Sequence, residues 1–206
     1  MARDDDEPAV HRLVIWEGVD AWRSEVAAVE LTADGVTASG TQVGVEPMPY
    51  RADYRLDASK GFVTARLEVV AQGTGWRREL QLVHDGRGGW TCRTTAGGEA
   101  ELPAPGGDAA TLSGALDCDL GLSPLTNVMP IRRSRIDRRP GAEDFLMAWV
   151  SMPDLGVHAS AQRYEHVRPG VVRYVDRGTF DGFRADLELD ADGLVERYPG
   201  LAKRVR

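Results

Sequence analysis

Apolar and polar side chains alternate with a period of two residues over much of this chain. Between residues 183 and 190 the apolar side chains Phe183, Ala185, Leu187 and Leu189 alternate with the charged side chains Arg184, Asp186, Glu188 and Asp190. Because successive side chains of a strand point to opposite faces, this pattern predicts an antiparallel strand with one buried face. Asp-Gly pairs at 85–86 and 192–193 are typical of hairpin turns between such strands. The alternation therefore indicates a mainly β protein.

Turn-forming residues are spread evenly instead of marking one linker, with 23 glycines and 11 prolines along the chain. Even punctuation of this kind favours a meandering sheet. Further strands are predicted at 13–16, 26–31, 63–69 and 145–152, and a long surface loop at 96–110. Helix signals are short, at 20–25 and 141–144. We expect one large, antiparallel, curved sheet or half-open barrel with few short helices.

The bulk properties are those of one globular unit. A length of 206 residues fits a single domain over 1–206, in which the acidic residues 1–10 form a flexible tail. A net charge of −7 argues against nucleic-acid binding and against docking on an anionic membrane. No apolar run approaches the roughly 18 residues that span a bilayer, and no secretory signal opens the chain. The two cysteines form no metal motif, so we expect a cytoplasmic protein with no metal or cofactor.

The chain resembles itself when it is shifted by 121 residues. Six of thirteen positions starting at Ala27 and at Ala148 are then identical. Chance similarity between hairpins is the alternative, because β sequences use a limited vocabulary. A true duplication would give internal repeats at about 25–92 and 145–202, and two such curved β units would enclose a cleft.

The segment between these repeats, Asp117 to Arg133, does not alternate. It contains two carboxylates, a Thr-Asn pair, two prolines and two arginines. Prolines remove backbone donors, so we expect a shaped loop and not a central strand. Asp117 and Asp119 point the same way if extended, whereas Arg132 and Arg133 point to opposite faces, so at most one arginine meets the carboxylates.

The same segment closely resembles the hallmark of a bacterial family known as "putative glycolipid-binding" proteins. The matching pattern is Asp-x-Asp-Leu-Gly-x-Ser-Pro-x-Thr-Asn-x-x-Pro-Ile-Arg-Arg, from Asp117. Other stretches resemble the family too: Tyr50-Arg51 with Tyr54 and Asp57; Pro153-Asp154-Leu155 with Gln162-Arg163-Tyr164; and the C-terminal part from Gly182 to Leu201. Phe62 is a departure, because the family more often carries Trp there. The resemblance implies a β-rich half-barrel with two related halves, similar to bacterial lipoprotein carriers, and a role in binding a glycolipid or similar amphiphile.

Each candidate residue has a functional and a structural interpretation. Asp117 and Asp119 suit acid–base chemistry or a head group, or pair with arginine inside the fold. Thr126 and Asn127 bind a ligand or satisfy their own loop. Arg132 and Arg133 suit anion recognition or an exposed strand edge. Gln162, Arg163 and Tyr164, with Tyr198, suit the lining of a cleft, because tyrosine has an apolar body and a polar tip.

Three functions follow from these residues. The first is non-enzymatic binding of an amphiphilic small molecule, in an apolar cavity with Asp117, Asp119, Arg132 or Arg133 at its mouth. The second is an enzyme acting on a small sugar or acid, with Asp117 and Asp119 as the acid–base pair. The third is a protein-interaction module that uses a sheet edge. No nucleophile with a neighbouring base is present in the sequence, so no catalytic residue is assigned.

Overall fold

One sheet of fourteen strands dominates the computed structural model, which describes residues 8–178 and 182–205. The strands are β1 (Val10–Gly18), β2 (Arg23–Leu31), β3 (Val36–Gly44), β4 (Tyr50–Ala58), β5 (Arg66–Gly73), β6 (Trp76–His84), β7 (Trp90–Gly98), β8 (Asp117–Leu120), β9 (Ala142–Val150), β10 (Val157–Arg168), β11 (Val171–Asp176), β12 (Arg184–Leu189), β13 (Val195–Tyr198) and β14 (Ala202–Arg204). The short helices are η1 (Ala109–Leu112), η2 (Leu125–Asn127) and α1 (Val128–Ser134). No helix in these ranges is both long and apolar enough to cross a bilayer.

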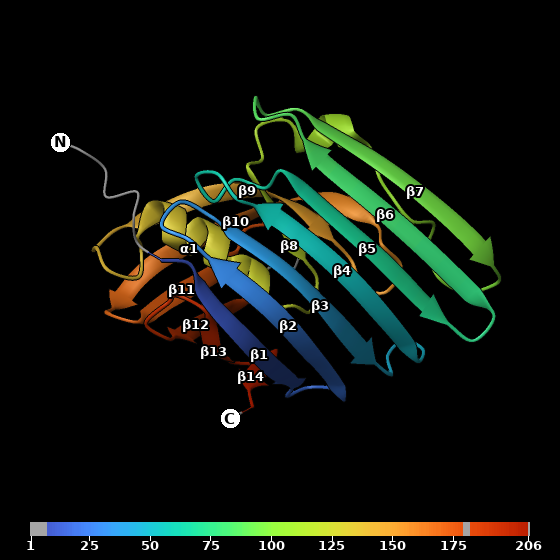
Figure 1. Cartoon of the computed structure of the whole chain (residues 1–206), viewed down its shortest axis with the longest axis horizontal. Helices are drawn as coiled ribbons and strands as arrows, with labels where there is room; N and C mark the ends of the chain where they lie inside the picture. The colour runs from blue at the N-terminus through green and yellow to red at the C-terminus, as the bar shows by residue number, and fades with distance from the viewer. Residues whose placement is uncertain (1–7, 179–181, 206) are drawn as a thin grey trace.

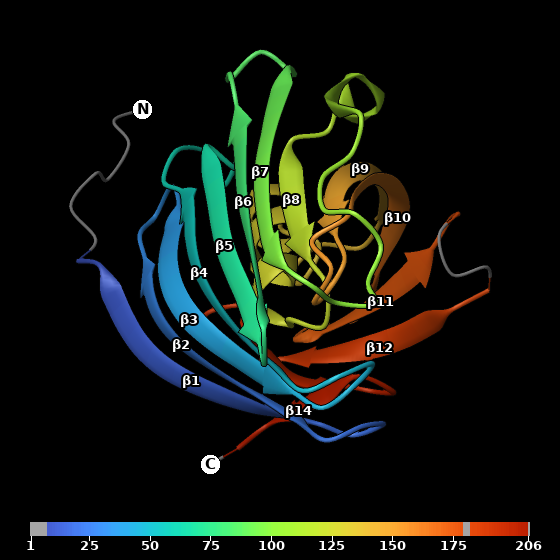
Figure 2. The same ribbon diagram turned by 90° about the vertical axis from the view of Figure 1, so that its right-hand side faces the viewer.

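The sheet consists of two meanders joined along one seam. Its order is β7-β6-β5-β4-β3-β2-β1-β14-β13-β12-β11-β10-β9-β8, so the first and last strands of the chain, β1 and β14, meet in the middle. Neighbouring strands are antiparallel, except that β8 is parallel to β9. The sheet curves strongly but does not close, and its two wings bend around β8 and α1 (Figures 1 and 2). This confirms the predicted fold class.

The alternating residues bury one face of the sheet, the concave one, in two apolar clusters. On β12, Ala185, Leu187 and Leu189 are all buried, as the period of two predicts. The larger cluster joins β1–β6 to β8 and β9, and the smaller one joins α1 to β9–β13. The central segment therefore supplies core residues to both wings.

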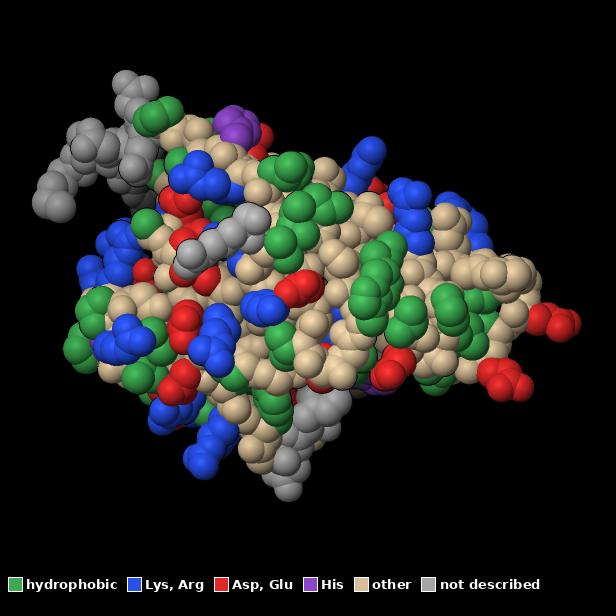
Figure 3. All heavy atoms as spheres, turned by 90° about the horizontal axis from the view of Figure 1, so that it is seen from below, with side chains coloured by type: hydrophobic (Ala, Val, Ile, Leu, Met, Phe, Trp, Pro, Cys, Tyr) green, Lys and Arg blue, Asp and Glu red, His purple; other side chains and the backbone are tan. Residues whose placement is uncertain are grey.

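The outer surface is polar and mixed in charge. Residues two apart on one strand, such as Arg66 and Glu68 on β5 or Arg77 and Glu79 on β6, form exposed ion pairs at 3.0 and 2.8 Å. On the face shown in Figure 3, acidic and basic side chains lie interspersed, and apolar side chains form several separate groups. Exposed pairs of this kind add little stability.

The predicted loop at 117–133 is wrong, because the segment folds as strand β8, then η2, then helix α1. Pro130 is the third residue of α1, where the missing N–H costs nothing, since the first four N–H groups of a helix have no partner inside it. Arg135 ends the helix in the left-handed conformation, at φ 57°. With only seven residues, the helix is too short to show a 3.6-residue period.

Three other boundaries differ from the sequence prediction. Both short helix signals belong to strand ends instead, because β2 begins at Arg23 and β9 begins at Ala142. Strand β7 continues to Gly98, which pairs with Trp76, so the loop is shorter than 96–110. The proposed acidic tail falls mostly on residues 1–7, outside the described residues, and Val10 already pairs with Leu31.

The proposed repeat stays a prediction, but the strand order is consistent with it. The shift of 121 residues brings the range of β2 over that of β9, β3 over β10 and β4 over β11. In each case the two matched strands are seven apart in strand number. A duplicated seven-stranded meander would produce this correspondence.

Trp16 strengthens the seam between the two meanders, where β1 and β14 share only three residue pairs. Its side chain is 1% exposed, and its Nε1 donates to the carbonyl of Val195 at 2.7 Å. We expect Trp16→Phe to lower the free energy of unfolding by about 2–4 kcal/mol, because it leaves that carbonyl unpaired and opens space. Trp22→Phe, at a side chain that is 64% exposed, is the control and should change it by less than about 0.5 kcal/mol. Equal effects in urea unfolding would contradict this role for Trp16.

Candidate functional site

Asp117 and Arg133 form a buried, two-pronged ion pair at the centre of the molecule. Both Nη atoms of Arg133 lie 2.5 Å from the carboxylate oxygens, and Asp117 is 1% exposed. Arg133 also donates to the carbonyl of Phe62 at 3.1 Å, and its guanidinium lies over the ring of Phe145 at 5.5 Å. Burial raises the pKa of Asp117, and Arg133 opposes this shift. The pair therefore connects β8, α1, β9 and the chain before β5, and Asp117 lies outside the lining of the pocket described below.

Asp119 lies on the same side of β8 but meets no arginine. Its two oxygens accept from Thr126 Oγ1 at 2.8 Å and from Gln162 Nε2 at 2.7 Å. Burial raises the pKa of this carboxyl too. Unlike Asp117, Asp119 faces a pocket.

Asn127 and Tyr164 form a second polar link between the central segment and β10. The hydroxyl of Tyr164 donates to Asn127 Oδ1 at 2.8 Å, and Asn127 Nδ2 donates to the carbonyl of Pro124 at 3.1 Å. Tyr164 is 2% exposed, so it orients Asn127 from inside the core. Asn127 itself reaches the lining of the pocket.

The structure does not bring Arg132 and Arg163 to this site. Arg132 lies over the ring of Phe62 at 5.5 Å and donates to the carbonyl of Asp192 at 3.4 Å. Arg163 alternates with the inward-facing Gln162 and therefore points outward, where it pairs with Asp144 at 2.7 Å. Phe62 is a buried core residue outside the pocket lining, so its departure from the family pattern changes packing and not the pocket.

The pocket next to Asp119 has a volume of about 430 Å³. It lies between the central segment, the end of β9 and strands β11–β13. Its lining comprises Asp20, Asp119, Leu120, Gly121, Leu122, Ser123, Asn127, Trp149, Ser151, Met152, Tyr174, Phe183, Tyr198, Gly200 and Leu201. Six of the predicted site residues contribute directly or by one contact: Asp119, Asn127 and Tyr198 line it, Thr126 and Gln162 bond Asp119, and Tyr164 bonds Asn127.

Aromatic rings form one wall of this pocket. The ring centroids of Tyr174, Phe183 and Tyr198 lie 5.9–6.3 Å apart, with planes tilted by 31–59°. Within the described residues the hydroxyls of Tyr174 and Tyr198 have no hydrogen-bonding partner. The wall thus offers apolar faces together with unused polar tips. Of these three residues the sequence predicted only Tyr198, because Tyr174 and Phe183 lie in other parts of the chain.

Glu25 is a buried carboxyl that sequence reasoning missed. It accepts from the hydroxyls of Tyr54 at 2.5 Å and Ser123 at 2.7 Å, and Gln42 Nε2 lies 3.4 Å away. Gly40 makes room for the Tyr54 ring, because a Cβ there would lie 2.4 Å from it. The alternation along β2 could have indicated it, because Glu25 lies on the same buried face as Ala27, Val29 and Leu31. Through Ser123, which lines the pocket, Glu25 connects β2 and β4 to the site.

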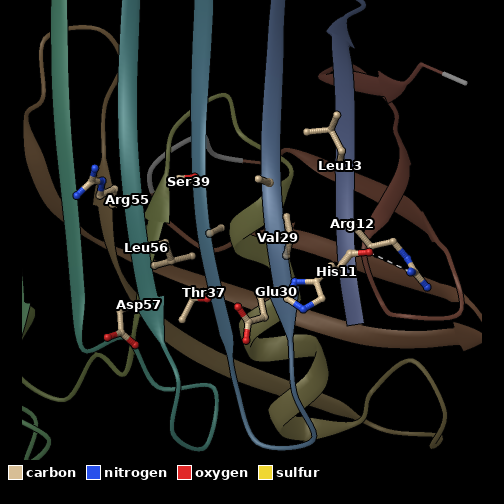
Figure 4. Close-up of a pocket in the computed structure, with 12 residues that line it drawn as sticks. His11, Arg12, Leu13, Val29, Glu30, Thr37, Ser39, Arg55, Leu56 and Asp57 are labelled. Atoms are coloured by element: carbon tan, nitrogen blue, oxygen red, sulfur yellow. Dashed lines mark hydrogen bonds between the residues drawn. The ribbon is translucent and has the colours of Figure 1, made fainter. Parts of the chain in front are cut away.

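A larger hollow of about 650 Å³ lies over strands β1–β4. Figure 4 shows its labelled side chains spaced over four neighbouring strands instead of converging on one point. Leu13, Glu30 and Arg55 contribute an exposed mixture of apolar and charged groups. Binding sites combine an enclosed apolar wall with a few convergent polar groups, so the smaller pocket beside Asp119 fits a site better.

Within the described residues, no group of three or more His, Cys, Asp or Glu side chains is placed to hold a metal ion. The groups that line the pocket offer hydrogen bonds and aromatic faces. A curved, open antiparallel sheet with an aromatic pocket beside a central strand–helix segment defines a class of half-barrel β proteins.

This chain belongs to the family described as "Putative glycolipid-binding", whose model matches residues 13–204. This confirms the resemblance seen in the sequence motifs. The fold is also similar to the crystal structure of a DUF1089 family protein from Pseudomonas aeruginosa, with a TM-score of 0.71 and 27% sequence identity over 88% of this chain and 92% of that one. No curated protein matches the chain.

The Asp117–Arg133 pair gives a stability prediction. Arg133→Met should lower the free energy of unfolding by about 3–5 kcal/mol, because it leaves a buried carboxylate without its partner. The double variant Asp117→Leu/Arg133→Met should recover at least half of that loss, since it removes both charges. Arg163→Met is the control at an exposed pair and should cost about 1 kcal/mol or less. Urea unfolding measures all three, and an equal loss in both single variants would contradict the central role of the pair.

Glu25 gives a pH prediction. Burial raises the pKa of Glu25 from 4.5 to about 7, so the folded protein holds a proton that the unfolded chain releases. Stability should therefore fall as pH rises from about 4.5 through 7, by on the order of 3 kcal/mol from this group. Glu25→Gln should remove this part of the fall and make the protein more stable than wild type at pH 8.

The matched control is Glu30→Gln, at an exposed carboxyl on the outer face of the same strand. Its stability should follow the wild-type pH profile. Unfolding by urea at pH 5, 6, 7 and 8 separates the two variants. Parallel profiles for Glu25→Gln and wild type would show that Glu25 does not hold the proton.

Proposed function

We propose that this protein binds an amphiphilic small molecule with a sugar-like head, and that it does so without catalysis. The observation that carries the proposal is the pocket in which the aromatic wall of Tyr174, Phe183 and Tyr198 meets Asp119 and Asn127 of the family motif. A volume of about 430 Å³ lies within the range of roughly 300–1,000 Å³ typical of small-molecule sites. The family description supports the same class of ligand.

The two parts of such a ligand match the two parts of the pocket. An alkyl chain gains about 0.8 kcal/mol for each buried methylene group, and Leu120, Leu122, Met152 and Leu201 supply apolar surface. A sugar ring presents one apolar face that packs on aromatic rings, and its hydroxyls need hydrogen-bonding partners. Asp119, Asn127 and the tyrosine hydroxyls provide them.

The acid–base alternative has less support from the same geometry. It requires both Asp117 and Asp119 to exchange protons with a substrate, but Asp117 is held by Arg133 and lines no pocket described above. Of these two carboxyls only Asp119 faces the pocket, without a partner carboxyl on β8. Binding without catalysis needs only the groups that line the pocket. The two free cysteines, Cys92 and Cys118, suit a reducing compartment and support the expected cytoplasmic location.

Octyl glucoside, a sugar head with an eight-carbon tail, tests this proposal. Titration below its micelle concentration, followed by calorimetry or by chemical shifts, should show saturable binding. Phe183→Ala should weaken binding about tenfold, because it removes part of the aromatic wall at a side chain that is already 36% exposed.

Leu13→Ala, in the hollow over β1–β4, is the matched control and should bind as wild type does. Absence of saturable binding would overturn the proposal. Weakening by Leu13→Ala but not by Phe183→Ala would place the ligand on the outer face instead.

A further inference from the structure

The charges around the pocket indicate which kind of head group it accepts. Among the described residues, its lining contains two carboxyl groups, Asp20 and Asp119, and no Lys, Arg or His. Asp20 is half exposed and pairs with Arg23 at 2.7 Å. Arg23 also donates to the carbonyl of Leu201, so this cation is held by two residues at the pocket edge. Asp119 is left as the one lining carboxyl without a cationic partner among the described residues.

An anionic head is disfavoured by this arrangement. The arginines of the family motif, which suit phosphate or sulfate, are used elsewhere: Arg133 pairs with Asp117, and Arg132 lies over Phe62. A sulfate or phosphate in the pocket would approach Asp119 without a counter-charge. Repulsion between like charges is stronger in a partly desolvated site than in water.

Hydrogen-bonding capacity favours a head with hydroxyl groups. A carboxylate offers about four acceptor positions, and Asp119 uses one on each oxygen, for Thr126 and Gln162. The hydroxyls of Tyr174 and Tyr198 are unused within the described residues. A quaternary ammonium head would suit the aromatic rings and the charge of Asp119, but it carries no hydrogen-bond donor or acceptor. It would therefore leave the polar groups of the pocket unpaired, at a cost in free energy.

We propose that the pocket is selective for an uncharged, hydroxyl-rich head, with Asp119 accepting hydrogen bonds from its hydroxyl groups and the tyrosine hydroxyls completing the contacts. This inference rests on the proposed binding function and specifies its ligand class. The motif suggests that its arginines bind the ligand. In this proposal Asp119 binds the head group instead, and Arg132 and Arg133 stabilise the fold.

Three probes with the same eight-carbon tail test the selectivity: octyl glucoside, octyl sulfate and octyltrimethylammonium, each below its micelle concentration. Since the tail is constant, differences in affinity report on the head. We expect octyl glucoside to bind at least about tenfold more tightly than either charged probe. Added salt should narrow the difference from octyl sulfate, because screening weakens repulsion.

A charge reversal at the pocket edge tests the electrostatic cause. Asp20→Lys should tighten octyl sulfate binding about tenfold, with little change for octyl glucoside, because it places a cation at the lining. Asp144→Lys makes the same charge change at an exposed residue outside the pocket lining and should alter octyl sulfate binding less than about twofold. Both sites are exposed, so both variants should fold. An equal effect of the two variants would overturn the local explanation.

Asp119→Asn tests the hydrogen bonds directly. It should weaken octyl glucoside binding about tenfold and reduce the discrimination against octyl sulfate, since the amide accepts fewer hydrogen bonds and carries no charge. The Asp119→Asn result is valid only if the variant unfolds at a temperature similar to that of wild type. If the variant is destabilised, Asp20→Lys tests the selectivity independently. Octyl sulfate or octyltrimethylammonium binding as tightly as octyl glucoside would overturn the selectivity but leave the binding function standing. Failure of all three probes to bind would overturn both.

Discussion

The rest of the structure depends on one buried ion pair, between Asp117 on β8 and Arg133 on α1. Removing two charges from water is costly, and the cost is offset here by two parallel hydrogen bonds, by the carbonyl of Phe62 and by the ring of Phe145. These contacts come from four places in the sequence. They hold the central segment between the two wings of the sheet, whose described strands pair with each other only at the seam of β1 and β14. An open sheet of this size needs such a filler, because its concave face has no second sheet to cover it.

The position of the central segment in turn creates the pocket. With α1 fixed, η2 places Thr126 against Asp119 of β8 and Asn127 against Tyr164 of β10. Gln162 of β10 also donates to Asp119. The chain between β8 and η2 then forms the floor of a space whose far wall comes from β11–β13. Glu25 supports this floor from the other wing through Ser123. The pocket is thus built by polar contacts on one side and by packed aromatic rings on the other.

Local sequence patterns predicted the sheet but only part of the site. The period of two is visible wherever one face of a strand is buried, as on β12, and Asp-Gly pairs mark the hairpins. Helix α1 was missed because seven residues with a proline give no periodic signal. Tyr174 and Phe183 of the aromatic wall were missed for a different reason: they lie apart in the sequence, and only the three-dimensional course of the sheet brings them to Tyr198. Glu25 was detectable, because a charged residue at an inward position of an alternating strand requires an explanation.

Asp117 and Asp119 are two residues apart on one face of one strand, yet their surroundings differ, and the helix opposite them is the reason. Successive residues on a helix are turned by about 100°, so Arg132 and Arg133 cannot both face β8. Arg133 reaches Asp117, and Arg132 turns away to Phe62 and Asp192. Asp119 lies opposite η2 instead, where the chain presents a hydroxyl and not a cation. Neutral donors orient a carboxylate without neutralising it, and they leave acceptor positions open. The same short motif therefore contains one carboxyl that holds the fold together and one that remains available to a ligand.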